Sequence, residues 1–257
     1  MSIRVEDISY IYGKGSPFEK TALSHVDLTI NKGEFIGVIG HTGSGKSTLI
    51  QHLNGLIHPT SGKVTIDGID LAAKTKDAVS KRHSAGMVFQ YPEHQLFEET
   101  VAQDIAFGPK NLGCDEEEVD KRVKSAMRFA GIDYEKFAGR SPFRLSGGQQ
   151  KRLALARTLA HPRPILILDD PFSALDKTTE VEVFEHLRQM VPDSVIFLIS
   201  HRLYLFSETD GVIWMDNGKA EFSSHEKLLE ENSAYRELYQ LQTDYSVAKP
   251  TESAIER

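Results

Sequence analysis

The chain has 257 residues and 40% hydrophobic content, which is enough for one large core or a core with small subdomains. A net charge of −7 argues against nucleic acid as the main partner, because phosphate backbones favour basic surfaces. The single Cys114 cannot form an internal disulfide, residues 1–6 lack a signal-peptide core, and no apolar run approaches the roughly 18 residues that span a bilayer. We therefore expect a cytoplasmic location and, for any membrane function, a separate membrane subunit.

The first predicted elements are strands. Residues 3–11 and 24–39 carry strand patterns, and the turn at residues 59–62 leads into a further strand and turn at residues 63–68. These pieces predict a small antiparallel sheet beside the main core.

A phosphate-binding loop follows residues 35–39, which predict a buried strand. Gly40-His41-Thr42-Gly43-Ser44-Gly45-Lys46-Ser47-Thr48 fits the pattern G-x-x-x-x-G-K-[ST], and a helix is predicted over residues 48–57. The glycines allow backbone N–H groups to surround phosphates at a helix start. Lys46 would reach the outer phosphates and the Ser47 hydroxyl would ligate Mg²⁺. The alternative is an ordinary Gly/Ser-rich turn, but the flanking strand and helix favour ATP or GTP binding.

From residue 91 to about residue 141 the pattern is helical. A helix from Glu116 to Gly131 places apolar residues on one face at three- and four-residue spacing, namely Val119, Val123, Ala126, Met127 and Ala130. Gly131 is the predicted cap. The acidic residues 115–118 suit the first turn of this helix and its dipole better than a metal site.

A short apolar strand, residues 165–168, places Asp169 at its C-terminal end, where open α/β sheets bind ligands. A carboxylate there can hold Mg²⁺, usually through water. Pro171 ends the strand because it has no N–H for the ladder. Without the phosphate loop, acidic turn residues after a strand would be the better interpretation.

Six motifs occur in the order seen in ABC transporter ATPases, and the chain resembles that family from about residue 3 to residue 242. They are the phosphate loop, Gln90, Leu145–Gln149, the Asp169 strand, Ser173–Asp176 and His201. The resemblance implies an α/β fold with a P-loop NTPase (RecA-like) core, an antiparallel β subdomain and an α-helical subdomain inserted at about residues 91–150. One ATPase domain would span residues 1–242, and the polar tail at residues 243–257 is predicted to be disordered.

The resemblance also implies a role for the glycine pair of the signature Leu145–Gln149. Ser146, Gly147 and Gly148 would precede a helix starting near Gln149, so that their hydroxyl and N–H groups form an anion site at a helix N-terminus. In ABC ATPases this site meets the γ-phosphate held by the other subunit. Two nucleotides are then sandwiched between two chains, which implies a second ATPase subunit.

Further roles come from the same resemblance. Gln90 would touch Mg²⁺ and the attacking water and sense the membrane partner, while His201 would hydrogen-bond the γ-phosphate. Asp176 belongs to a loop that would cross the dimer interface. Tyr12 is expected to stack on adenine, with Tyr10 as competitor. Taken singly, Gln90 would be a strand-end polar residue, His201 a structural histidine and Tyr12 part of a strand face.

Asp170 departs from the family pattern, which usually places glutamate there to orient the attacking water. Aspartate retracts the carboxylate by roughly 1 to 1.5 Å, and a misplacement of about 1 Å can cost 10²-fold in rate. We therefore expect Asp170 to give a slow hydrolytic site. Because the signature Leu145–Gln149 is intact and could complete a partner's site, a heterodimer is favoured over a homodimer.

The two halves of the chain resemble different transporters. Residues 40–56, 88–100 and 104–113 resemble energy-coupling factor ATPases of vitamin and transition-metal uptake, whereas residues 165–176, 200–203 and 224–238 resemble exporter ATPase domains. Natural divergence, recombination and a constructed chimera remain open. We favour uptake, with a transmembrane coupling subunit and a peripheral location at the cytoplasmic membrane face, because the membrane-facing surface lies in the first half. Two functions outside transport are less favoured. A non-transport ABC switch usually carries coiled-coil insertions, which this chain lacks, and a small-molecule kinase would leave the signature Leu145–Gln149 unexplained.

Overall fold

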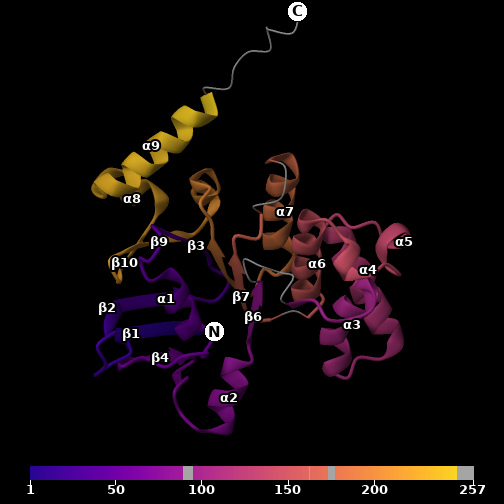
Figure 1. Cartoon of the computed structure of the whole chain (residues 1–257), viewed down its shortest axis with the longest axis horizontal. Helices are drawn as coiled ribbons and strands as arrows, with labels where there is room; N and C mark the ends of the chain where they lie inside the picture. Colours follow the sequence, from indigo (N-terminus) through magenta and orange to yellow (C-terminus); the bar gives the residue numbers. More distant parts are fainter. Residues whose placement is uncertain (89–94, 162, 173–176, 248–257) are drawn as a thin grey trace, which may run out of the picture.

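The computed structural model describes residues 1–88, 95–161, 163–172 and 177–247, which form two β-sheets and a set of helices (Figure 1). This is the predicted α/β class, a P-loop NTPase fold. None of the helices in these ranges combines the length and apolar character needed to cross a bilayer.

A six-stranded sheet forms the centre of the molecule, with strand order β10-β9-β3-β8-β7-β6. Its strands are β3 (Phe35–Gly40), β6 (Ala85–Val88), β7 (Ile165–Asp169), β8 (Val195–Ile199), β9 (Gly211–Asp216) and β10 (Lys219–Ser223). All neighbours pair in parallel except β10, which is antiparallel to β9. Alternate residues of β3 enter different cores, Ile36 on one face and Phe35 on the other, as expected of a parallel strand covered on both faces.

A four-stranded antiparallel sheet packs against one face of this sheet. It contains β1 (Ser2–Tyr12), β2 (Lys20–Asn31), β4 (Ser61–Ile66) and β5 (Ile69–Asp70), in the order β2-β1-β4-β5. The predicted antiparallel sheet is therefore confirmed, but the prediction of one strand over residues 24–39 is wrong. Gly33, at φ 80°, turns the chain after Asn31, so β2 and β3 belong to different sheets.

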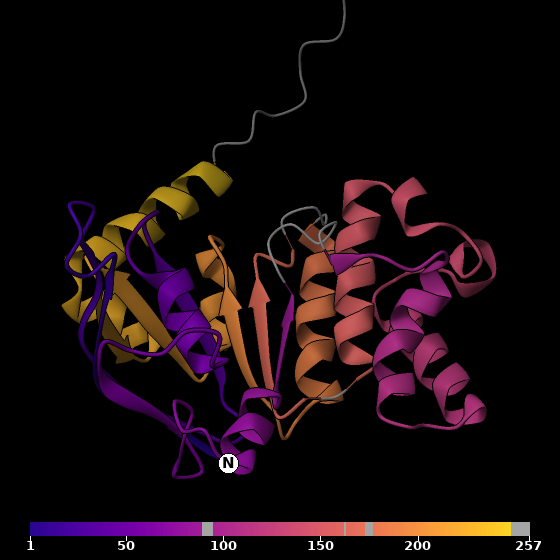
Figure 2. The same ribbon diagram turned by 60° about the horizontal axis from the view of Figure 1, so that its bottom comes forward.

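The helices surround the six-stranded sheet and form a separate cluster at one end (Figure 2). They are α1 (Lys46–Leu53), α2 (Lys76–Arg82), α3 (Val101–Asn111), α4 (Glu116–Phe129), α5 (Tyr134–Phe137), α6 (Gly147–Leu159), α7 (Lys177–Met190), α8 (His225–Glu231) and α9 (Ser233–Val247), with 3-10 helices η2 (Pro142–Arg144) and η3 (Leu203–Glu208). Helix α1 begins two residues earlier than predicted and ends at Leu53, since Gly55 adopts φ 71°.

Helix α4 confirms its prediction. All five apolar residues of the predicted face are buried in a core shared with α3 and α6. The Asp115 side chain accepts the Glu118 N–H at 2.8 Å as an N-cap, and Gly131 follows the helix at φ 65°. The acidic run is therefore a helix start.

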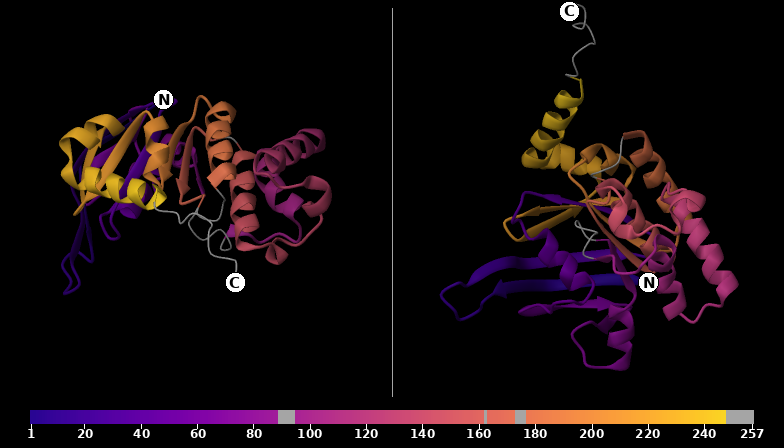
Figure 3. Two further views of the ribbon diagram at one scale, coloured as in Figure 1. Left: turned by 90° about the horizontal axis from the view of Figure 1, so that it is seen from above. Right: turned by 45° about the vertical axis from the view of Figure 1, so that its right-hand side comes forward.

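The C-terminal helices α8 and α9 lie at the opposite end of the molecule from this helical cluster (Figure 3). Helix α9 extends to Val247, so residues 243–247 are helical where we expected the start of a disordered tail. Three side chains of α9, Tyr235, Leu238 and Tyr239, join the core on the second face of the sheet.

The central strand β7 offers a test of this core. Ile167 is fully buried there, and we expect Ile167→Ala to lower the free energy of unfolding by about 2–5 kcal/mol because it leaves a cavity. Urea denaturation measures the change. Leu241→Ala is the matched control, because Leu241 is 51% exposed and should cost less than about 0.5 kcal/mol. Equal losses in the two variants would contradict the placement of β7.

Candidate functional site

The phosphate loop joins β3 to α1, and its shape requires glycine. Gly40, Gly43 and Gly45 have φ angles of 156°, 83° and 108°. A Cβ atom at Gly40 would lie 2.1 Å from the Met215 carbonyl oxygen, and one at Gly45 would lie 2.7 Å from the Ala22 carbonyl oxygen. Gly43 has no atom within 4 Å of such a position. Two glycines are therefore needed for close packing, while the third leaves space above the loop.

The loop presents donors suited to phosphate. Gly45 is the N-cap of α1 and supplies no side-chain acceptor, so the first-turn N–H groups can bind an anion. Lys46 Nζ donates to the carbonyl oxygens of Gly40 at 2.7 Å and His41 at 2.9 Å. The buried Ser44 hydroxyl has no hydrogen-bond partner among the described residues. These donors suit the phosphates of a nucleoside triphosphate.

A cavity of about 210 Å³ opens beside the loop, lined by Tyr12, Lys20, Ala22, Gly43, Gly45, Lys46, Ser47 and Thr48. Tyr12 is 42% exposed, and its hydroxyl lies 3.3 Å from Thr48 Oγ1. Tyr10 packs instead against His52, with ring centroids 4.9 Å apart. Tyr12 is thus the tyrosine at the cavity. Lys20 and Ala22 were missed by the sequence analysis, because β2 comes from the other sheet.

His41 of the loop is tied to the end of β9. Its Nε2 lies 2.9 Å from Asp216 Oδ1, and its Nδ1 lies 3.0 Å from the Thr42 carbonyl oxygen. The hydrogen bond to the Thr42 carbonyl, and then the one to Asp216, raise the pKa of His41. Sequence analysis could not find Asp216, since the pair is 175 positions apart.

The charges of Asp170, Lys46 and His201 all act on the Asp169 carboxyl. Burial raises the pKa of the Asp169 carboxyl, and the charge of Asp170 raises it further, whereas Lys46, His201 and Lys151 oppose the rise. Burial also lowers the pKa of Lys46, which Asp169 opposes. The structure therefore brings these predicted residues together at the C-terminal edge of the sheet. Carboxylate and hydroxyl oxygens, such as those of Asp169 and Ser47, are ligands of the kind Mg²⁺ prefers.

Asp170 has a conformation that the sequence did not predict. Its φ is 48°, in the left-handed region, and its N–H donates to the Ile199 carbonyl oxygen at 2.9 Å. Aspartate is one of the few residues other than glycine that tolerate this region. The backbone hydrogen bond to β8 fixes the point from which the Asp170 carboxylate extends.

The second glycine motif lies at the N-terminus of α6, which begins at Gly147, two residues before the predicted start. Ser146 is its N-cap: Ser146 Oγ accepts the Gln149 N–H at 3.4 Å, and Gln149 Oε1 accepts the Ser146 N–H at 2.9 Å. Gly147 and Gly148 thus belong to the first turn. This motif does not line the phosphate-loop cavity of its own chain. Gln90 and Ser173–Asp176 lie outside the described residues.

Comparison with known proteins identifies the class. The model of the family "ABC transporter" matches residues 23–173, more than half of the chain, and the chain therefore belongs to the ABC transporter family. It is a transport ATPase of this family, whose members use ATP with Mg²⁺.

One relative and two solved structures are similar to this chain. The "Energy-coupling factor transporter ATP-binding protein EcfA2" of Clostridium tetani is 50% identical over 205 residues, covering 79% of this chain and 71% of that protein. The dimeric ATP-binding cassette MJ0796 bound to ADP and Pi matches with a TM-score of 0.77 and 29% identity over 87% of this chain and 98% of that one. A bacterial Atm1-family ABC exporter with ATP bound matches with a TM-score of 0.79 and 29% identity. The match covers 94% of this chain and 42% of the exporter chain.

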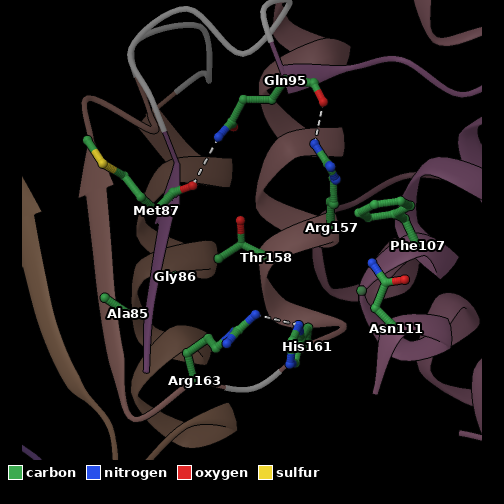
Figure 4. Close-up of a pocket in the computed structure, with 11 residues that line it drawn as sticks. Ala85, Gly86, Met87, Gln95, Phe107, Asn111, Arg157, Thr158, His161 and Arg163 are labelled. Atoms are coloured by element: carbon green, nitrogen blue, oxygen red, sulfur yellow. Dashed lines mark hydrogen bonds between the residues drawn. The ribbon is translucent and has the colours of Figure 1, made fainter. Parts of the chain in front are cut away.

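A second cavity, of about 240 Å³, lies between β6, α3 and α6 (Figure 4). Arg157 Nε lies 3.3 Å from the buried Asp104 Oδ1, and its guanidinium lies over the Phe97 ring. At the other end of the cavity Arg163 Nη2 lies 3.0 Å from His161 Nδ1. Burial lowers the pKa of His161 to about 4, and the charges of Arg163 and Arg122 add to this effect. The half-buried imidazole is therefore neutral at pH 7.

His161 predicts a loss of stability in mild acid. Since its pKa is lowered in the fold, the unfolded chain takes up a proton first as the pH falls from about 6.5 toward 4, and stability falls with it. His161→Gln keeps an acceptor for Arg163 but cannot be protonated, so it should lose less stability between pH 7 and pH 5. Urea denaturation at both values measures this, with the exposed His83→Gln as control. An unchanged pH dependence in His161→Gln would contradict the interpretation.

Proposed function

We propose that this chain is the ATP-hydrolysing subunit of an energy-coupling factor transporter that takes up vitamins or transition-metal ions. One observation carries the proposal: Lys46 of the phosphate loop, the Asp169 and Asp170 carboxylates and His201 come together from three separate segments. Such a site suits ATP hydrolysis, and the similarity to EcfA2 of Clostridium tetani supports the type of transporter.

The residues have the following proposed roles in ATP binding. Backbone N–H groups of residues 40–48 and Lys46 bind the phosphates, and Tyr12 stacks on adenine. Ser47, Asp169 and Gln90 hold Mg²⁺, which neutralises charge on the outer phosphates. The open Gly43 position and the cavity beside Tyr12 support this assignment.

Two side chains act on the reacting end of the nucleotide. His201 hydrogen-bonds the γ-phosphate, and Asp170 accepts a hydrogen bond from the attacking water and orients it. The Ile199 contact holds Asp170 at the strand end, but its side chain is one methylene shorter than the glutamate usual in the family. This difference supports a slow site.

A second ATPase chain completes each site in this proposal. The signature residues Ser146, Gly147, Gly148 and Gln149 stand at the N-terminus of α6 and do not line their own chain's cavity, so they can face a partner's γ-phosphate. The similar MJ0796 cassette was solved as a dimer with ADP and Pi. Because Asp170 slows one of two sites, we propose a heterodimer, bound through a transmembrane coupling subunit at the cytoplasmic membrane face. Residues 1–242 would form its ATPase domain.

An exporter-type complex is the second candidate, since the fold also matches the Atm1-family exporter. The two candidates differ in the membrane subunit. Co-expression with an uptake coupling protein and with an exporter membrane domain separates them, because each candidate predicts co-purification with one of the two. Co-purification with the exporter membrane domain, and none with the uptake coupling protein, would make the exporter-type complex the preferred candidate.

Lys46→Ala tests the nucleotide site in the co-purified complex. We expect loss of the thermal stabilisation by Mg²⁺-ATP and a fall of at least about 10²-fold in phosphate release, since the lysine charge acts on the outer phosphates. Lys32→Ala is the control, because Lys32 forms an exposed ion pair with Asp193. Normal phosphate release by Lys46→Ala, or none by the unaltered complex, would refute the proposed function.

Asp170→Glu tests the slow site. The longer side chain should bring the carboxylate to the attacking water and speed single-turnover phosphate release by up to about 10²-fold. A cost of about 1 kcal/mol in stability is expected, because glutamate tolerates φ 48° less well than aspartate. Asp193→Glu on the exposed surface should change neither quantity. An unchanged single-turnover rate in Asp170→Glu would show that Asp170 does not limit hydrolysis.

A further inference from the structure

The segment that carries His201 is bonded to the last turns of α9. The Leu203 N–H donates to Gln242 Oε1 at 3.0 Å, and Gln242 Nε2 donates to the His201 carbonyl oxygen at 2.5 Å. The Gln242 amide therefore both accepts and donates a hydrogen bond, and its two partners are the residues on either side of Arg202. These contacts join positions 39 and 41 residues apart.

The side chains after His201 are anchored on the other side by α7. Arg202 forms an ion pair with the buried Glu180, and the Tyr204 hydroxyl donates to Glu180 Oε2 at 2.7 Å. Leu203 is fully buried. His201 itself has an exposed side chain, so its neighbours and not its own packing determine where its imidazole stands.

Helix α9 can act as an anchor because it is itself fixed. Tyr235 is fully buried, its hydroxyl lies 2.7 Å from His225 Nδ1, and its ring meets Trp214 of β9 at 5.7 Å between centroids. Gln242 lies two turns further along the helix. The core thus holds α9, and α9 holds the backbone at His201.

We propose that Gln242 is a positioning residue for His201: by binding the His201 carbonyl and the Leu203 N–H, it sets the distance of the imidazole from the γ-phosphate. The proposal rests on the role in ATP hydrolysis proposed above for His201. Since a displacement of about 1 Å can cost 10²-fold in rate, release of the backbone should affect the chemical step. Gln242 does not line the cavity beside Tyr12, so ATP binding should not change.

The test compares Gln242→Ala with Gln240→Ala in the full chain, assembled in its transporter complex. Gln240 lies on the same helix and is exposed, which makes it a matched control. We expect kcat to fall about 10- to 100-fold in Gln242→Ala, with KM for ATP and the melting temperature nearly unchanged, and no change in Gln240→Ala. Gln242→Glu still accepts the Leu203 N–H but cannot donate to His201, so its kcat should be intermediate.

A structural readout accompanies the kinetics. Hydrogen exchange of the Leu203 amide should accelerate in Gln242→Ala and stay unchanged in Gln240→Ala, because only the first variant removes its acceptor. An unchanged Leu203 exchange rate would show that the hydrogen bond is not formed in solution, and would overturn the proposal.

His201→Ala separates this inference from the proposed function. If His201→Ala is slow and Gln242→Ala keeps its kcat, the positioning role is refuted while the proposed site stands. If His201→Ala keeps full activity, the role of His201 fails and the positioning role with it. The double variant should be no slower than His201→Ala, because Gln242 acts through that imidazole. An additive loss would assign Gln242 another role and overturn the proposal.

Discussion

The close approach of the phosphate loop to two carbonyl oxygens is the constraint on which the site depends. Gly40 lies against the Met215 carbonyl of β9, and Gly45 lies against the Ala22 carbonyl of β2. Any side chain at these positions would push the loop away from both sheets. Because the loop is seated there, α1 starts at Lys46, and its first-turn N–H groups open toward the cavity beside Tyr12. The loop therefore links the antiparallel sheet to the parallel one at the nucleotide site.

The second requirement is electrostatic. Asp169 is partly buried next to Asp170, and burial and the neighbouring charge both oppose its ionisation. Lys46, His201 and Lys151 compensate only in part, since the pKa of Asp169 stays raised. Two adjacent carboxylates in a partly buried site favour a divalent cation. The same arrangement that makes the site costly without a cation thus fits it to Mg²⁺ and a polyphosphate.

The sequence predicted those parts of the fold whose cause is local. The glycine spacing of residues 40–48, the apolar strand before Asp169 and the amphipathic face of α4 each depend on neighbouring residues, and these elements were found as predicted. The break between β2 and β3 was missed because one apolar pattern continues across Gly33 while the chain changes sheets. The start of α6 was placed too late because the glycines at residues 147 and 148 suggested a loop, whereas the cap formed by Ser146 and Gln149 stabilises a helix over them.

Contacts between distant segments could not be predicted from the sequence. They connect the phosphate loop and the segment that carries His201 to the same strand and helix. Asp216 at the end of β9 binds His41 of the loop, and Trp214 of the same strand meets Tyr235 of α9. Gln242 of α9 in turn binds the backbone at His201. The loop and the histidine opposite it are thus attached to one unit formed by β9 and α9. Contacts therefore connect α9 to the backbone at His201 through Gln242, and to β9, which binds His41 of the loop, through Tyr235 and Trp214.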